Sequence, residues 1–279
     1  MIDYHVHPDF SPDAEGSIEA YCERAVELGL EEICFTTHHE PDPARRDYEE
    51  VHVNGRAQPV DSDWPDAYFA ALQAARAKFP SVAVLAGVEV GYEPGFEGII
   101  SDFLRRHPFD FVLGAIHCLD HIAITAGEEL DRFKVEYMSR GPEFVAERYL
   151  HHLRAAAGCQ LFDCLAHLDI YRKYVEPLYG QRFGAAVESL LPVVLNFVAE
   201  SGTGIEVNSS ALRRGNAEPY PALRILKLAK DAGVRVFTVG SDAHRPADLG
   251  KGLESAVRAL EGIGVEPARF RRRKLVSAV

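Results

Sequence analysis

Long hydrophobic runs are absent from the sequence, which contains no stretch of 18 consecutive apolar residues. A membrane-spanning helix needs about that length, so none is expected. The first ten residues, MIDYHVHPDF, have neither the basic start nor the apolar centre of a secretory signal peptide. We therefore expect a protein that is neither inserted in a membrane nor exported.

Cysteine pairs with metal-binding or redox spacing are absent too. The five cysteines include no CxxC pair, and Cys159 and Cys164 stand five positions apart, which is not a zinc-ribbon spacing. The odd number of widely spaced cysteines does not suggest a disulfide framework. We interpret them as reduced thiols and expect a cytoplasmic protein.

Positive charge is scarce. The chain has 30 lysines and arginines against 42 aspartates and glutamates, a formal net charge of −12. This charge disfavours a nucleic-acid partner, and the RRRK run at 271–274 is too isolated to form a basic groove. A small anionic substrate remains compatible with the charge, because bound metal ions can reverse the local potential. The oligomeric state is not indicated.

No repeat, low-complexity segment or linker divides the chain, so we expect one domain over residues 1–279. This length is normal for an α/β barrel. Short apolar runs flanked by turn residues recur along the chain and are typical of buried parallel strands. These runs are 2–6, 32–36, 82–89, 111–116, 162–166, 204–208 and 234–240.

Amphipathic stretches alternate with these runs, which favours a parallel α/β barrel or sheet. The predicted helices cover residues 17–29, 63–79, 142–158, 184–201 and 221–232, and another begins near Pro246. Residues 40–62 and 118–140 lack this rhythm. They are predicted to be active-site lids or, equally, surface loops.

Potential metal ligands stand at the carboxyl ends of the predicted strands. They are His5, His7, His38, Glu89, His117, His167, Asp242 and His244. In a parallel barrel these ends open onto one face, where active sites form. Imidazoles and carboxylates suit zinc, manganese or iron. The sequence therefore predicts a metal cluster at that face.

Each part of this pattern has a simpler explanation. An H-x-H pair alone is a weak signal, a salt bridge would account for the buried carboxylate of Glu89, and Asp242 could cap the following helix. The combination is far more specific than its parts, because all these explanations would have to hold together. His39 adjoins His38, and its role is left open.

Six motifs make the chain resemble a known family. They are HVH at 5–7, TTH at 36–38, GVE at 87–89, AIH at 115–117, AHLD at 166–169 and GSDAH at 240–244. Their order and spacing resemble the PHP (polymerase and histidinol phosphatase) family, and within it the histidinol-phosphatase branch. The resemblance implies a single-domain, distorted (β/α)7 barrel, similar to a TIM barrel, with three divalent metal ions drawn from zinc, manganese and iron.

The resemblance also implies how the ligands are shared. One ion would be held by His5, His7, Glu89 and Asp242; Glu89 would bridge to a second held by His117 and His167; and a third would be held by Asp13, His38 and His244. Two positions depart from the family pattern. Ala115 replaces a common serine and Thr37 a common aspartate, but neither is a ligand.

Substrate contacts follow from the same resemblance. Arg172 follows AHLD as a basic residue does in this branch, and EVNSSALR at 206–213 resembles its E-x-N-T-S-G-x-R segment. Asn208, Ser209 and Arg213 would then lie at the mouth of the site. Arginine suits phosphate because it offers two parallel donors. The alternative is that Arg172 and Arg213 are solvated surface residues.

The predicted reaction is phosphomonoester hydrolysis, with L-histidinol phosphate as the favoured substrate. A hydroxide bridging two ions beside Glu89 would attack phosphorus, and Asp242 and His244 are the candidate general acids. Alternatives are a phosphoesterase for a sugar phosphate, nucleotide or phosphotyrosine, a metal-dependent amidohydrolase, and a non-catalytic metal-binding regulator. The complete ligand set argues against the last.

Overall fold

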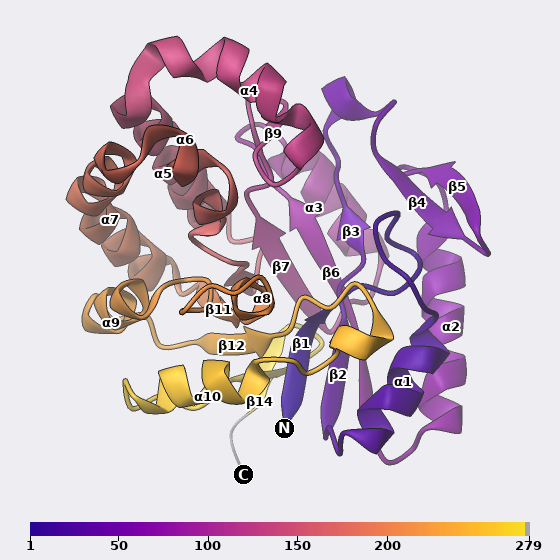
Figure 1. The fold of residues 1–279 in the computed structure, drawn as a ribbon. Coiled ribbons are helices and arrows are strands. Elements are labelled where there is room, and N and C mark those ends of the chain that lie inside the picture. The colour runs from indigo at the N-terminus through magenta and orange to yellow at the C-terminus, as the bar shows by residue number, and fades with distance from the viewer. Residues whose placement is uncertain (277–279) are drawn as a thin grey trace.

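A computed structural model describes residues 1–276, and its centre is one curved sheet of parallel strands (Figure 1). In spatial order the strands are β1 (Ile2–Val6), β2 (Glu32–Phe35), β6 (Ala83–Gly91), β7 (Phe111–Ala115), β10 (Cys164–Leu165), β11 (Gly204–Asn208) and β12 (Phe237–Gly240). A short strand, β3 (His38–His39), also pairs with β6. Spatial order follows chain order, as it does in barrels of parallel strands joined by helices.

The first and last strands of the sheet meet and nearly close it into a barrel. The amide of Asp242 donates to the carbonyl of His5 at 2.8 Å, and the amide of His7 donates to Ala243 at 2.9 Å. These bonds continue the sheet past the end of β12, so the seven-stranded, TIM-like barrel predicted from the sequence is confirmed.

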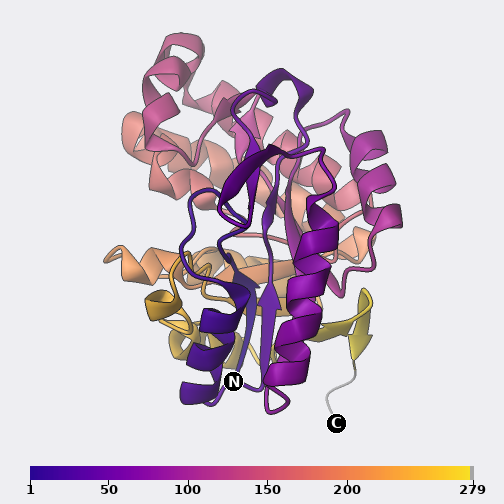
Figure 2. The same cartoon turned by 90° about the vertical axis from the view of Figure 1, so that its right-hand side faces the viewer.

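Helices cover the outside of the barrel (Figures 1 and 2). They include α1 (Ile18–Glu27), α2 (Trp64–Lys78), α3 (Glu97–Arg106), α5 (Gly141–Gly158), α7 (Gln181–Ser201), α9 (Leu223–Asp231) and α10 (Leu253–Glu261). Ser17 caps α1 as predicted, since its Oγ accepts a hydrogen bond from the amide of Ala20 at 3.2 Å.

One predicted helix starts later than expected, and α3 is the longest of the helices that were not predicted. Only a 3-10 turn, η5 (Pro246–Asp248), follows Pro246, and α10 begins after Gly250 and Gly252, both of which have positive φ. The helix α3 carries no N-cap signal, because Phe96 occupies its cap.

The two irregular segments form structure beyond the carboxyl ends of β6 and β7 (Figure 1). Residues 40–62 contain η1 (Pro43–Arg45) and the hairpin of β4 (Glu50–Val53) and β5 (Arg56–Pro59). Residues 118–140 contain the hairpin of β8 (Cys118–Leu119) and β9 (Ile122–Ala123), then η2 (Gly127–Glu129), α4 (Leu130–Tyr137) and η3 (Met138–Arg140). Between β10 and α7 lie η4 (Ile170–Lys173) and α6 (Val175–Tyr179), and α8 (Ser210–Arg213) follows β11.

The basic run near the C-terminus serves the fold. It lies in the hairpin of β13 (Arg269–Arg271) and β14 (Lys274–Val276). Arg271 pairs with Glu32 at 2.9 Å and Arg273 with Asp163 at 3.2 Å. These two arginines are engaged by carboxylates of the barrel.

The helix α7 is long and apolar enough to cross a membrane by length and composition alone. That is weak evidence, because core helices of soluble proteins meet the same criterion. Its apolar residues Phe183, Val187 and Leu191 are buried, and α7 packs along α5.

Candidate metal centre

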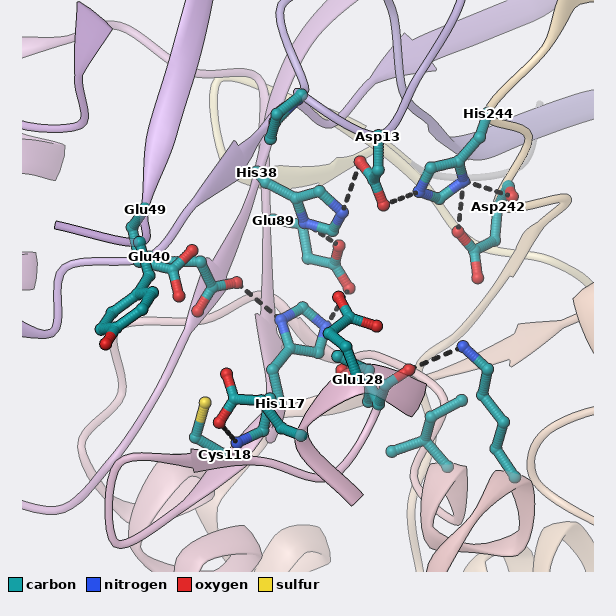
Figure 3. Close-up of a pocket in the computed structure, with 18 of the residues that line it drawn as sticks. Asp13, His38, Glu40, Glu49, Glu89, His117, Cys118, Glu128, Asp242 and His244 are labelled. Atoms are coloured by element: carbon teal, nitrogen blue, oxygen red, sulfur yellow. Dashed lines mark hydrogen bonds and ion pairs between the residues drawn. The ribbon is translucent and has the colours of Figure 1, made fainter. Parts of the chain in front are cut away.

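Nine predicted metal ligands gather at the carboxyl end of the barrel, and Figure 3 shows Asp13, His38, Glu89, His117, Asp242 and His244 among them. The nine are His5, His7, Asp13, His38, Glu89, His117, His167, Asp242 and His244. All except Asp13 come from strand ends or from the residues directly after them, as the sequence predicted. Asp13 reaches the cluster from the loop between β1 and α1.

Glu89 lies at the centre of the cluster, and one of its oxygens faces two histidines. Its Oε1 is 2.9 Å from Nε2 of His167 and 3.3 Å from Nε2 of His117. The carboxylate is buried, with 1% of its side chain exposed. These three side chains form one group of potential ligands.

The other oxygen of Glu89 faces a second group. Its Oε2 is 3.3 Å from Nε2 of His5 and 3.5 Å from Nε2 of His7. Asp242 Oδ1 lies 3.8 Å from the same nitrogen of His5 and 3.5 Å from that of His7. Glu89 therefore stands between two sets of donor atoms.

A third group lies on the open side of the cluster. Nε2 of His244 is 3.1 Å from Oδ2 of Asp13, and Nε2 of His38 is 3.8 Å from its Oδ1. The ring of His7 also stacks against those of His38 and His244, at centroid distances of 4.1 and 4.3 Å. Asp13 thus joins two histidines from opposite ends of the chain.

The donor atoms fit divalent metal ions. Nε2 of His5 and Nε2 of His7 are only 2.8 Å apart. Nδ1 of His5 lies 2.6 Å from Glu206, so its proton points there and Nε2 is left with a lone pair. Nδ1 of His38 lies 3.0 Å from Oε2 of Glu89, and both atoms are buried. Bound cations would satisfy these atoms.

Two glutamates that the sequence analysis missed hold the rings of two predicted ligands in place. Glu206 on β11 accepts from His5, and Glu40 accepts from Nδ1 of His117 at 2.6 Å. Each leaves the opposite ring nitrogen free for a metal ion, as carboxylates behind metal-bound histidines do. Strand alternation was the available signal, since Glu40 stands two residues after His38.

The charges in the cluster shift one another's pKa values. Burial raises the pKa of Glu89, yet His5, His117 and His38 together hold it well below its usual range. Burial lowers the pKa of His38, but Asp13 and Glu89 raise it to about 9. Because metal ions replace protons on histidine nitrogens, metal binding here should release protons.

Two of the predicted ligands sit on strained backbone. His167 has φ of 28° and Asp242 has φ of 54°, in the left-handed region that non-glycine residues rarely adopt. Such conformations persist only where surrounding structure fixes them, and they concentrate at functional sites.

The predicted substrate residues differ in their surroundings. Arg213 lines the cavity above the cluster, but its terminal nitrogens donate to the carbonyls of Ser241 and Asp242. Arg172 does not line that cavity: its Nη1 donates to Asp169 at 3.0 Å and to the carbonyl of Pro219 at 2.9 Å.

Asn208 and Ser209 are buried beneath the cavity wall. The amide of Asn208 donates to Glu206 at 3.2 Å and to Asp242 at 3.3 Å. The hydroxyl of Ser209 donates to the carbonyl of Lys251 at 2.7 Å. Neither lines the cavity, so they lie behind the ligands and not at the mouth.

His39 points away from the cluster. Its ring stacks on Phe103 with centroids 3.7 Å apart, and burial lowers its pKa to about 3. Adjacent residues of a strand face opposite sides, so His38 faces the cluster while His39 packs outside the barrel.

A cavity of about 900 Å³ opens above the ligands. Its wall includes Glu40, Glu49, Glu50, Glu128 and Glu129, and also Arg45, Arg132, Lys173, Arg213, Arg214 and Arg245. Several of these residues come from the two irregular segments, which therefore shape the cavity.

Comparison with protein families agrees with this geometry. The family described as "PHP domain" matches residues 3–210. The chain belongs to the PHP family. Within its matched region lie all the predicted ligands except Asp242 and His244, which follow β12.

Two relatives match this chain over most of its length. A "probable histidinol-phosphatase" of Deinococcus radiodurans is 28% identical, with 99% of this chain and 98% of the relative covered. A "histidinol-phosphatase" of Lactococcus lactis is 25% identical, with 87% and 84% covered.

A solved structure has the same fold. It is the histidinol phosphate phosphatase of Lactococcus lactis, solved in complex with zinc, L-histidinol and phosphate. The TM-score is 0.80 at 24% identity, with 99% of this chain and 98% of the other covered.

Proposed function

We propose that this protein is a metal-dependent phosphomonoesterase that hydrolyses L-histidinol phosphate to L-histidinol and phosphate. The observation that carries the proposal is the buried Glu89, whose two oxygens face two separate groups of histidine nitrogens below an open cavity. Relatives named histidinol-phosphatase that match nearly end to end support the choice of substrate.

The proposed metal site has three positions. His5, His7, Glu89 and Asp242 would hold one ion; Glu89, His117 and His167 a second; and Asp13, His38 and His244 a third. Zinc is the metal present in the related Lactococcus structure, and manganese or iron would suit the same donors.

The metal ions, when bound, would neutralise charge on the phosphoryl group and lower the pKa of water to about 7. The protein fixes their positions: Glu206 and Glu40 orient His5 and His117. Asp242 and His244 line the cavity; His244 is the candidate to pass a proton to the leaving alkoxide, because, although burial raises the pKa of Asp242, His5 and His7 hold it well below its usual range. Glu89 remains ionised between the histidines.

The acidic part of the cavity supports a substrate that also carries positive charge. Glu40 and Glu49 lie on the side of His117 away from Asp13 and His244 (Figure 3). L-Histidinol carries an ammonium group, which these carboxylates would attract. Sugar phosphates and nucleotides lack such a group beside their phosphate.

We also propose that residues 1–279 act as one catalytic unit in the cytoplasm, without a nucleic-acid or membrane partner. Asp242 and His244 lie beyond the matched family region and yet join the cluster. All five cysteines are free, which suits a reducing compartment.

Phosphate release tests the proposal. The metal-loaded protein should hydrolyse L-histidinol phosphate with a kcat/KM well above those for a sugar phosphate, a nucleotide, phosphotyrosine and p-nitrophenyl phosphate. Equal values across the panel would refute the substrate assignment. No turnover of any ester by folded, metal-loaded protein would refute the enzymatic function.

A further inference from the structure

Two adjacent basic residues of η4 have different surroundings. Arg172 is held by the buried Asp169 and by the carbonyl of Pro219, and its guanidinium lies 5.2 Å from the ring centre of Tyr220. These contacts fix Arg172 against the loop before α9. It is not part of the cavity wall among the residues that the structure describes.

Lys173 lines the cavity together with His167 and Ile170. Its ammonium donates one hydrogen bond, to the carbonyl of Thr125 at 2.8 Å. An ammonium has three N–H donors, so two remain for another acceptor. Thr125 lies just after β9 and also lines the cavity, so the contact directs the lysine along the cavity wall.

The charges around Lys173 connect it with the metal centre. Burial and Arg214 lower its pKa, while Asp242 and Asp13 raise it. Both carboxylates belong to the proposed metal site, yet within residues 1–276 Lys173 forms no ion pair at 4.0 Å or less. A partly buried ammonium without a carboxylate partner is suited to binding an anion that enters the cavity.

Arg213 is less free to bind substrate. Its two terminal nitrogens hold the carbonyls of Ser241 and Asp242, in the turn whose backbone is strained at Asp242. Both arginines suggested by the family resemblance are therefore already engaged: Arg172 with Asp169 and Arg213 with this turn.

We propose that Lys173 donates a hydrogen bond to a phosphoryl oxygen of the substrate and of the phosphate product. Arg172 then stabilises the fold through its contacts with Asp169 and Pro219, and Arg213 acts as a positioning residue for the turn at Asp242. This inference rests on the proposed phosphomonoesterase function, but it holds for any phosphate ester that the cavity accepts.

The test compares Lys173→Met with Arg172→Met in metal-loaded protein. The measurements are kcat/KM for p-nitrophenyl phosphate, the dissociation constant of inorganic phosphate by calorimetry, the metal content and Tm. Lys173→Met should weaken phosphate binding and lower kcat/KM about 10–100-fold, as expected for loss of a hydrogen bond to a charged group. Its metal content and Tm should stay at wild-type values, and Lys173→Arg should restore part of the phosphate affinity.

Arg172→Met should instead lower Tm, because it leaves the buried Asp169 without its partner, while folded protein binds phosphate as the wild type does. Wild-type phosphate affinity in Lys173→Met would overturn the proposal. So would weakened phosphate binding in Arg172→Met with an unchanged Tm. If Arg172→Met fails to fold, the phosphate affinities of Lys173→Met and Lys173→Arg still test the proposal. Phosphate binding by wild-type protein that hydrolyses no ester would count against the proposed function and not against Lys173.

Discussion

Oε1 of Glu206 lies 2.6 Å from Nδ1 of His5, and this contact links β11 to β1 across the inside of the barrel. The other oxygen of Glu206 accepts from the amide of His167 at 2.9 Å. One carboxylate thus fixes the ring of His5 and the backbone of His167, two of the proposed metal ligands. Gly240 allows this, because a Cβ there would meet both Glu206 and His5.

Glu206→Gln should weaken metal binding. Glutamine has one side-chain oxygen where glutamate has two, so its NH2 group would face either the backbone amide of His167 or Nδ1 of His5. It could not accept the hydrogen bond that the carboxylate accepts at that position. The loss of affinity should be about 10–100-fold, the usual effect of removing a carboxylate behind a metal-bound histidine. Metal retained against a graded chelator series measures it. Glu188→Gln, at an exposed ion pair on α7, is the control. Equal retention by both variants would show that Glu206 does not orient the ligand.

Gly91→Ala should displace Glu40, because a Cβ at Gly91 would occupy the position of its carboxylate. His117 would lose its partner, so kcat should fall at least tenfold and metal content should drop. Gly98→Ala on α3 is the matched control, since a Cβ there meets nothing within 4 Å. That variant should keep full activity and gain up to about 1 kcal/mol of stability. Full activity in Gly91→Ala would contradict the role of Glu40.

Glu49→Gln should reduce discrimination for cationic substrates. Glu49 accepts from Arg45 at 2.8 Å, and Arg45 also pairs with Glu129, so this part of the wall has excess negative charge. We expect kcat/KM for L-histidinol phosphate to fall about 5–30-fold, equivalent to about 1–2 kcal/mol. Turnover of p-nitrophenyl phosphate, which has no cation, should change little. Parallel losses on both substrates would exclude a contact with the ammonium group.

His152 should make the protein less stable in mild acid. Burial and Arg148 lower its pKa from 6.5 to about 4. The unfolded chain therefore takes up a proton below pH 6.5 that the folded protein does not, so the free energy of unfolding falls as pH drops from 6.5 to 4.

His152→Leu should lose stability less steeply over this range, by up to about 1.4 kcal/mol per pH unit. The ring nitrogens of His152 have no hydrogen-bond partner within residues 1–276, so replacing the ring by leucine removes no hydrogen bond. Urea unfolding at several pH values measures the slope. His151→Gln, at the exposed neighbouring position, should match the wild type. Identical slopes in all three proteins would contradict the prediction.

The strand ends could be predicted from sequence because apolar runs mark the strands and parallel strands share one active face. That reasoning brought His5, Glu89 and Asp242 together across the chain. It could not find Glu206, whose partner lies 201 residues away. It also could not predict where the side chain of Arg172 points, because that depends on Asp169 and on a carbonyl 47 residues later. Local patterns give the elements, whereas side-chain partners depend on the packed structure.

The barrel closure has a consequence for the order of folding. β1 pairs with the residues after β12 through His5 and Asp242. The first strand to be synthesised therefore completes its pairing only after nearly the whole chain has been made. Contacts this distant in sequence form slowly, because the intervening chain must first be ordered. During synthesis, His5 and His7 emerge long before Asp242 and His244. A full complement of metal ions can therefore be held only once the whole barrel has been made, and metal uptake would report completed folding.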